Sequence, residues 1–245
     1  MNEDTTSQVR VNFGRPFPLF PLDGVVLLPH AMLRLFVFEP RYRQMTEAVL
    51  DGSGQIAMAV FDGEDWTEEY LGNPPICPAV CIGQIAHHER LADGTYRLWL
   101  QGICRARIVE ELEPEDDRLY RAAMLEPIGE TDVEEHLLHE HRRTLDGLLH
   151  EQPLRDLACV QRLHEQLQDQ VGGLDEVPTS VLDDVIALSL LAGLERPGVM
   201  YRLLEESSPE ERARLVESEL RVLSRLLEHA ARQYDPDAPS GISWN

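Results

Sequence analysis

The sequence contains no lysine, and all 22 of its basic residues are arginines. A P-loop binds nucleotide phosphates with the lysine of its Gly-Lys-Ser/Thr motif. A Ser–Lys dyad uses a lysine as the base that activates its serine. These 245 residues therefore contain neither a P-loop ATPase site nor a Ser–Lys protease site.

Cysteines and long apolar runs are also scarce. The longest apolar segment, Val185–Leu194, is about half as long as a membrane-spanning helix. Residues 1–10 are too polar for a secretory signal, so we expect a cytoplasmic protein that does not bind membranes. The cysteines are too few and too scattered for a disulfide framework, and we expect reduced, buried thiols at Cys77, Cys81, Cys104 and Cys159.

Positive charge is outweighed throughout the chain. The sequence has 44 acidic residues against 22 basic ones, which gives a formal net charge of −22. A field of this sign repels phosphate backbones and anionic lipids. We therefore expect no nucleic-acid partner, and we expect basic protein partners to be favoured.

The segment from Phe17 to Tyr42 organises the first half of the chain. Val25–Leu28 is a short apolar run between Asp23-Gly24 and Pro29, which predicts a buried strand. Leu33, Leu35 and Val37 alternate with Arg34, Phe36 and Phe38, which predicts a second strand with one inward face. Glu39-Pro40 then begins a helix, because proline is tolerated in the first turn.

Four further strands follow this helix. Residues 55–61 predict a central strand, and residues 76–109 predict a long hairpin. Its turn, Asp93-Gly94, is the commonest signal for a type I′ turn, and Gly102 indicates a bend or bulge in the return strand. Residues 119–125 predict the last strand.

The strand pattern ends after Pro127. Apolar residues then recur at helical spacing, and Ser208-Pro209-Glu210-Glu211 is a capping box that predicts the start of a long helix. We divide the chain into a flexible arm (1–15), a β-barrel (16–128), a helical bundle (129–234) and a flexible tail (235–245).

Two stretches carry a family resemblance. The first is Phe17-Pro18-Leu19-Phe20-Pro21-Leu22 with Leu28-Pro29 and Phe38-Glu39-Pro40-Arg41-Tyr42-Arg43. The second is Ile82-Gly83-Gln84-Ile85 with Leu100-Gln101-Gly102-Ile103-Cys104-Arg105. Both resemble the N-terminal domain of Lon protease, the LON substrate-binding domain, in its stand-alone form without ATPase or protease domains. Many relatives have glycine where this chain has His30, so the turn after Pro29 is expected to be built differently.

The resemblance implies an α+β fold, a PUA-like antiparallel β-pseudobarrel with one helix followed by an α-helical bundle. It also implies a non-enzymatic module that recognises proteins or unfolded peptides, an adaptor in protein quality control or proteolysis. A separate AAA+ protease is a further candidate partner. The alternative is a small-molecule-sensing domain on the same barrel, and the oligomeric state is left open.

Aromatic residues outside the expected core are the candidate partner-binding residues. Trp66 and Tyr70 lie in a polar loop, where a core role is not forced. Core packing is the competing explanation for Phe36 and Phe38, because at least one of them is expected to point inward. The full set is Phe36, Phe38, Trp66, Tyr70 and Trp99.

No residue is predicted to be catalytic, and no metal or cofactor is expected. His136, His139 and His141 lie close together in sequence but lack the H-E-x-x-H spacing of a zinc site, which favours a solvated helix face. Arg97, Arg105 and Arg107 form a small basic stripe, which we expect to pair with neighbouring acids rather than to bind RNA.

Overall fold

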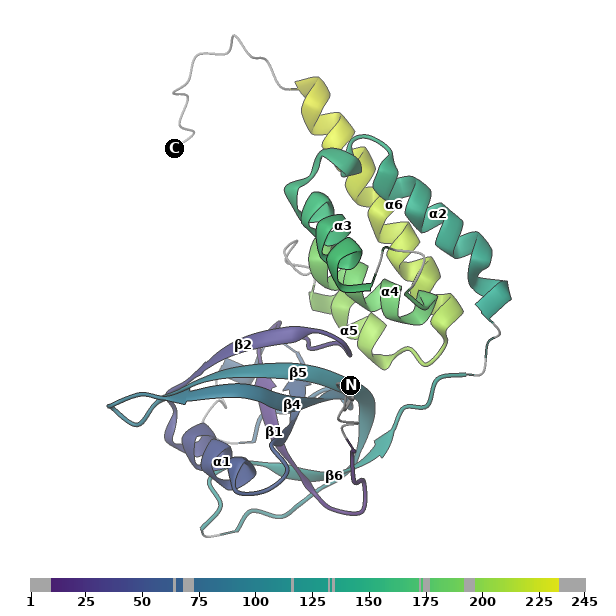
Figure 1. Ribbon diagram of the computed structural model, residues 1–245. Coiled ribbons are helices and arrows are strands. Elements are labelled where there is room, and N and C mark those ends of the chain that lie inside the picture. Colours follow the sequence, from purple (N-terminus) through teal and green to yellow (C-terminus); the bar gives the residue numbers. More distant parts are fainter. Residues whose placement is uncertain are drawn as a thin grey trace, which may run out of the picture. The chain divides into compact units, whose positions relative to one another are not determined.

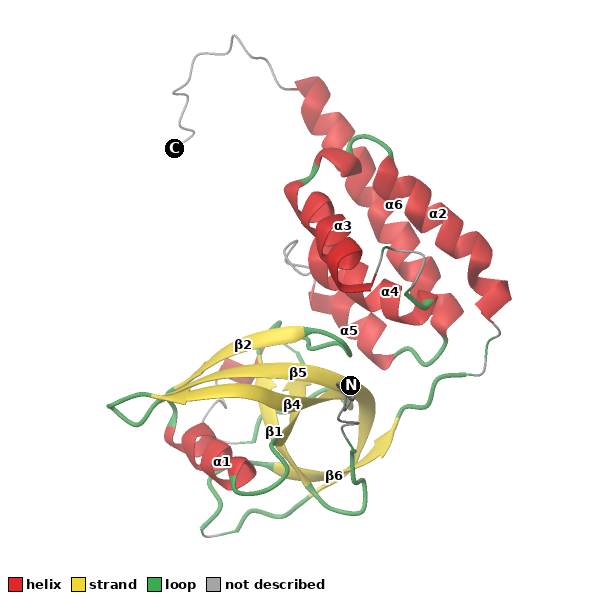
Figure 2. Ribbon diagram, in the orientation of Figure 1, coloured by secondary structure: helices red, strands yellow, loops and turns green. Residues whose placement is uncertain are grey.

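The computed structural model describes residues 10–63, 65–67, 73–115, 117–131, 133, 135–171, 173, 177–191 and 197–233. The chain forms two compact units. The barrel unit contains Met1–Asp132 and Leu191–Pro209, and the helical unit contains Val133–Leu190 and Glu210–Asn245. All the described strands belong to the barrel unit (Figure 2), and the expected α+β class is confirmed.

The barrel unit is built on one six-stranded sheet. Its strand order is β2-β5-β4-β3-β1-β6, and β5 also pairs with β6. That pairing closes five strands into a ring, and β2 extends the sheet beyond β5 (Figure 1). The pairings are antiparallel except that between β1 and β3, which is parallel. The strands are β1 (Phe17–Leu22), β2 (Met32–Val37), β3 (Gln55–Val60), β4 (Ala79–Arg90), β5 (Tyr96–Glu111) and β6 (Ala122–Pro127).

Buried apolar side chains from the five strands of this ring form one core cluster. Every residue of β3 is buried, as expected of a central strand with neighbours on both sides. Helix α1 (Pro40–Leu50) begins at the predicted proline and buries one face through Tyr42, Met45 and Val49. The buried cluster consists of Phe17, Leu19, Ala57, Ala59, Val80, Ile82, Ala106, Ala123 and Leu125.

The first strand lies earlier than the sequence predicts. Val25–Leu28 is irregular, and the proline-containing segment Phe17–Leu22 forms β1 instead. A proline removes a ladder hydrogen bond and is tolerated where the strand has little pairing to lose. The pairing of β1 with β6 covers only Phe17 and Pro18, so one side of β1 has few such bonds.

The turn after β1 packs directly on Gly102 of β5. The Gly102 N–H donates to the Ala31 carbonyl (2.8 Å), and the His30 N–H donates to the Gly102 carbonyl (3.0 Å). A Cβ atom at residue 102 would lie 2.0 Å from the Leu28 carbonyl oxygen, so glycine is required. The ladder between β4 and β5 also shifts register here, which confirms the predicted bulge.

His30 has a φ of 66°, in the left-handed region that glycine occupies without strain. The turn therefore has a backbone conformation that glycine adopts more readily, although a histidine occupies the position. The next strand, β2, begins two residues later at Met32, so this turn fixes where β2 starts.

The hairpin between β4 and β5 ends in a longer turn than expected. A type I′ turn requires a positive φ at both central residues, but of Asp93 and Gly94 only Gly94 has one (79°). The Gly94 N–H donates to the Leu91 carbonyl (2.9 Å), and the loop spans residues 91–95. The Asp93 carboxylate accepts hydrogen bonds from the Thr95 hydroxyl and N–H, which lower the pKa of Asp93.

Helix α5 (Pro197–Glu205) belongs to the barrel unit, although the sequence-based division assigned it to the bundle. The Ala79 N–H of β4 donates to the Tyr201 hydroxyl oxygen (2.8 Å), and burial raises the pKa of Tyr201 to about 12. Arg105 of β5 is 5% exposed, and its Nε donates to the Leu203 carbonyl (3.2 Å). That carbonyl is among the last four of the helix, which lack partners within it.

The helical unit contains four α-helices among the described residues. They are α2 (His139–His150), α3 (Ala158–Val171), α4 (Thr179–Ile186) and α6 (Pro209–Gln233), with α6 beginning at the predicted proline. Short 3-10 turns cover Glu135–Leu138 and Leu154–Asp156, and a π-helical turn covers Ala187–Leu191. No described helix has the length and the apolar character that a bilayer crossing requires.

A side-chain hydrogen bond joins α2 to α6 within the helical unit. His141 Nδ1 lies 3.2 Å from a carboxylate oxygen of Glu217, and Arg221 Nε donates to that carboxylate at 3.0 Å. Burial raises the pKa of Glu217, but the hydrogen bonds from Arg221 and His141 outweigh it and lower the pKa below its ordinary value.

Candidate protein-binding surface

Strands β2 and β5 share an outward face at the edge of the sheet. Opposed residues of an antiparallel pair point to the same side, and the three exposed residues of β2 each oppose a residue of β5. The pairs are Met32 with Gln101, Arg34 with Trp99, and Phe36 with Arg97. We call these six residues the β2–β5 outer face.

The apolar side chains of this region are exposed to solvent. Met32 is 53% exposed, Phe36 is 56% exposed and Phe38, just after β2, is 60% exposed. The two phenylalanine rings lie with their centroids 6.0 Å apart. The prediction that at least one of them packs in the core is wrong, because the 1%-exposed Val37 and the half-buried Leu33 and Leu35 take the inward positions of β2.

Trp99 provides a third aromatic side chain on the same face. It is half-buried, opposes Arg34 across the ladder, and packs edge-on against the ring of His87 with centroids 4.8 Å apart. The structure therefore brings three of the sequence-predicted residues, Phe36, Phe38 and Trp99, to one edge of the barrel.

The other two candidates do not join this surface. Trp66 lies in the 3-10 turn Asp65–Thr67 and stacks on Phe61, with ring centroids 4.9 Å apart and planes within 4°. Phe61 is 6% exposed, so the indole covers the edge of the core. Tyr70 lies outside the described residues.

The three arginines of the predicted basic stripe have different roles. Arg97 pairs with Glu89 of β4 at 3.1 Å, and Arg107 lies 3.9 Å from Glu126 of β6. Arg105 is buried against α5 and does not reach the surface. Arg34 of β2 is exposed and forms no ion pair with any residue that the structure describes. The β2–β5 outer face thus carries one cation that forms no ion pair with these residues.

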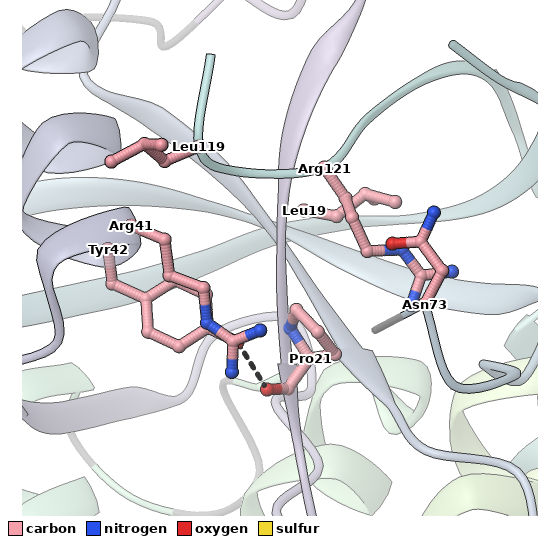
Figure 3. Close-up of a pocket in the computed structure, with 7 residues that line it drawn as sticks. All are labelled: Leu19, Pro21, Arg41, Tyr42, Asn73, Leu119 and Arg121. Carbon is pink, nitrogen blue, oxygen red and sulfur yellow. Dashed lines mark hydrogen bonds between the residues drawn. The ribbon is translucent and has the colours of Figure 1, made fainter. Parts of the chain in front are cut away.

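A separate cavity of about 400 Å³ opens on the barrel unit (Figure 3). We call it the Arg41–Arg121 cavity. The Arg41 guanidinium pairs with Glu39 at 3.1 Å, and the Arg121 guanidinium pairs with both oxygens of Glu111 at 2.7 and 2.9 Å. Each cation therefore has a carboxylate beside it. The lining residues are Leu19, Pro21, Arg41, Tyr42, Asn73, Leu119 and Arg121.

The described residues form no metal-binding cluster, and two of the cysteine thiols have raised pKa values. Within these ranges no group of three or more His, Cys, Asp or Glu side chains gathers to hold a metal ion. Burial, followed by the charge of Asp62, raises the pKa of the Cys77 thiol, and burial raises that of Cys104. Thiols shifted in this direction are poor nucleophiles at neutral pH.

Comparison with known families identifies the fold. The family model of the ATP-dependent protease La (LON) substrate-binding domain matches residues 16–222. The chain belongs to this family.

Curated relatives are full Lon proteases, and the chain covers only a small part of them. It is 27% identical to Lon protease of Azorhizobium caulinodans over 106 residues, which is 43% of this chain and 12% of that protein. It is 30% identical to Lon protease of Escherichia coli K12 over 111 residues, which is 44% of this chain and 13% of that protein. The chain therefore spans about an eighth of the length of these LON relatives.

Solved structures agree with this assignment at the level of fold. The N-terminal domain of Mycobacterium avium complex Lon protease aligns with a TM-score of 0.59 and 17% identity, covering 84% of this chain and 98% of that one. The Lon N-terminal domain protein of Xanthomonas campestris aligns with a TM-score of 0.51 and 20% identity, covering 87% of this chain and 98% of that one.

Two residues of the LON barrel surface were not among the sequence-based candidates. Met32 and Arg34 share the exposed face of β2 with Phe36. The alternation of Leu33, Leu35 and Val37 with their neighbours already indicated which residues point outward. No local sequence pattern indicates the Arg41–Arg121 cavity, because its lining residues come from several separate segments between residues 19 and 121.

Proposed function

We propose that this LON-domain chain is a non-enzymatic recognition module that binds proteins in non-native, partly extended states. The supporting observation is the pair of phenylalanines at the sheet edge, Phe36 and Phe38, which are 56% and 60% exposed with rings 6.0 Å apart. Adjacent exposed apolar side chains of this size are typical of interaction sites. The family description, a substrate-binding domain, supports the same role.

The two rings can contribute substantially to binding. Each residue exposes about 100 Å² of the area that an aromatic residue can bury. Covering that area contributes about 2.5 kcal/mol of binding free energy before ordering costs are subtracted. Two such contacts favour weak, broadly selective capture of apolar segments. The net charge of −22 would further favour substrates with basic regions.

The test is binding of a fluorescent, permanently unfolded protein to the full chain. The double variant Phe36→Ser/Phe38→Ser is expected to weaken binding at least tenfold. The matched control is Leu226→Ser, which removes an apolar side chain that is also 56% exposed but lies on α6 of the helical unit. Equal affinities for the double variant, the control and the wild-type chain would contradict the proposal.

A separate AAA+ protease is the second partner that we propose, with the chain acting as an adaptor in the cytoplasm. The test is crosslinking in native lysate followed by mass spectrometry of the captured proteins. The adaptor role predicts an ATP-dependent protease that is captured equally by the wild-type chain and the Phe36→Ser/Phe38→Ser variant, because that variant affects only substrate capture. Recovery of the chain with no protease would contradict the adaptor role.

The alternative function is small-molecule sensing, and the Arg41–Arg121 cavity favours it. A volume of about 400 Å³ lies within the range of small-molecule sites. A ligand of this cavity would raise the melting temperature of the chain. The variant Leu119→Trp, which places a larger side chain in the lining, would abolish that increase, whereas Phe36→Ser/Phe38→Ser would retain it. Screening a metabolite collection without any such shift would remove this alternative.

A further inference from the structure

Strand β2 is an open edge of the barrel sheet. It stands at one end of the strand order, and among the described strands it pairs only with β5. An edge strand presents unpaired backbone N–H and C=O groups on its free side, which makes it a template for an added strand. Many proteins block such edges with charges or prolines. Here the outward residues at both ends of β2, Met32 and Phe36, are apolar, and the one outward charge of the strand is Arg34 between them.

The residues of β2 define what an added strand must carry. Met32, Arg34 and Phe36 occupy alternate positions and therefore face the same side. Residues of a neighbouring strand would stand opposite them, with Cβ atoms about 4.5–5.5 Å away. Apolar side chains fit opposite Met32 and Phe36, and an acidic side chain fits opposite Arg34.

Charge favours a strand that carries an acidic residue over a second copy of this chain as the partner of the free edge of β2. Arg34 is exposed and has no ion-pair partner among the described residues, whereas Arg97, the other arginine of the β2–β5 outer face, is already paired with Glu89 at 3.1 Å. A carboxylate on the added strand would therefore meet a cation that is not neutralised. A second copy of this chain would bring another net charge of −22 and, in a register centred on Arg34, a second arginine opposite the first.

We propose that β2 binds an extended substrate segment as an added strand, and that the preferred segment reads apolar-x-acidic-x-apolar, with its acidic residue paired to Arg34. This inference rests on the proposed function and specifies its substrate class. Main-chain hydrogen bonds along β2 supply affinity, and the three alternate side chains supply selectivity.

The test compares two soluble peptides that differ at one position, Leu-Thr-Glu-Thr-Leu and Leu-Thr-Lys-Thr-Leu, in identical flanking sequences. Cross-strand charge pairs predict that the full chain binds the glutamate peptide about 2- to 30-fold more tightly than the lysine peptide at low salt. Arg34→Glu is expected to reverse this order. Arg107→Glu is the matched control, because it makes the same change in net charge at another exposed site on β5 and should leave the order unchanged.

A second readout tests for an added strand rather than an unspecific apolar contact. Methylating backbone nitrogens on one edge of the glutamate peptide is expected to abolish binding, and methylating those on the other edge is expected to leave it intact. Binding that survives methylation of either edge, or that is lost equally whichever edge is methylated, would overturn the added strand.

The outcomes separate this inference from the proposed function. If Arg34→Glu leaves the peptide order unchanged while Phe36→Ser/Phe38→Ser still releases an unfolded protein, the acidic preference is wrong and the proposed function stands. Failure of both peptides to bind a chain that still captures the unfolded protein also overturns the inference. If the double variant and the wild-type chain bind every probe equally, the proposed function itself fails.

Discussion

Replacing Gly102 with alanine should destabilise the barrel and displace the strand that carries the candidate surface. The new Cβ atom would lie 2.0 Å from the Leu28 carbonyl oxygen, whereas ordinary contact begins at 3.4 Å. Two hydrogen bonds span this contact, from Gly102 to Ala31 (2.8 Å) and from His30 to Gly102 (3.0 Å). Overpacking costs about 1–3 kcal/mol and each hydrogen bond about 0.5–1.5 kcal/mol, so we expect a loss of about 2–6 kcal/mol.

Urea unfolding followed by far-UV circular dichroism measures this loss. A domain is stable by about 5–15 kcal/mol, so Gly102→Ala should lower the midpoint clearly or prevent folding. The control is Gly129→Ala, where an added Cβ atom has nothing within 4 Å and the change should be within about 0.5 kcal/mol. Because the turn precedes β2, Gly102→Ala should also weaken capture of an unfolded protein. Stability and binding equal to those of Gly129→Ala would refute the packing of this turn on β5.

Three further variants test other contacts. Arg105→Met leaves the Leu203 carbonyl without its buried donor and should cost about 2–4 kcal/mol in urea unfolding; an unchanged midpoint would contradict this. His30→Gly relieves the strain of a left-handed φ of 66° and should stabilise the chain by up to about 1 kcal/mol. A destabilised variant would show that the contacts of the His30 side chain outweigh this backbone strain. The lowered pKa of Glu217 gives stability that is present above the unfolded-state pKa and lost as the pH falls through the folded-state pKa. Glu217→Gln should therefore be less stable than the wild-type chain at pH 7, and the two should become equally stable as the pH falls below the folded-state pKa of Glu217. A pH-independent difference would contradict this.

Elements with a strong local pattern were predicted correctly from the sequence. The hairpin of β4 and β5, the central strand β3, and the first residues of α1 and α6 each follow from alternation, helical spacing or proline position. These signals are contained within a few neighbouring residues, so no knowledge of tertiary contacts is needed to read them.

The errors arose where distant residues decide the structure. Val25–Leu28 has the composition of a strand, but the turn that follows it is held on Gly102, more than seventy residues later. Phe36 and Phe38 look like core residues by hydrophobicity, yet the pleat of β2 leaves the inward positions to their neighbours. Helix α5 resembles the rest of the bundle in composition, and only its contacts with Ala79 and Arg105 reveal that it packs on the barrel.

The candidate surface was recoverable from the sequence only in part. The aromatic residues could be named, because they are few and stand out from their surroundings. Their grouping depends on the register of β2 against β5, which places Arg34 opposite Trp99 and Phe36 opposite Arg97. Neither this register nor the lack of an ion pair at Arg34 among the described residues can be read from residues 32–38 alone.

Hydrogen exchange of the full chain, measured by mass spectrometry with and without a bound unfolded protein, tests the central claim most directly. If substrates bind at the edge of the barrel sheet, exchange should slow over residues 32–38 and over the facing part of β5, residues 96–101. The Phe36→Ser/Phe38→Ser variant should lose this protection under the same conditions. Slower exchange confined to other segments, with residues 32–38 unchanged in the bound state, would contradict the account.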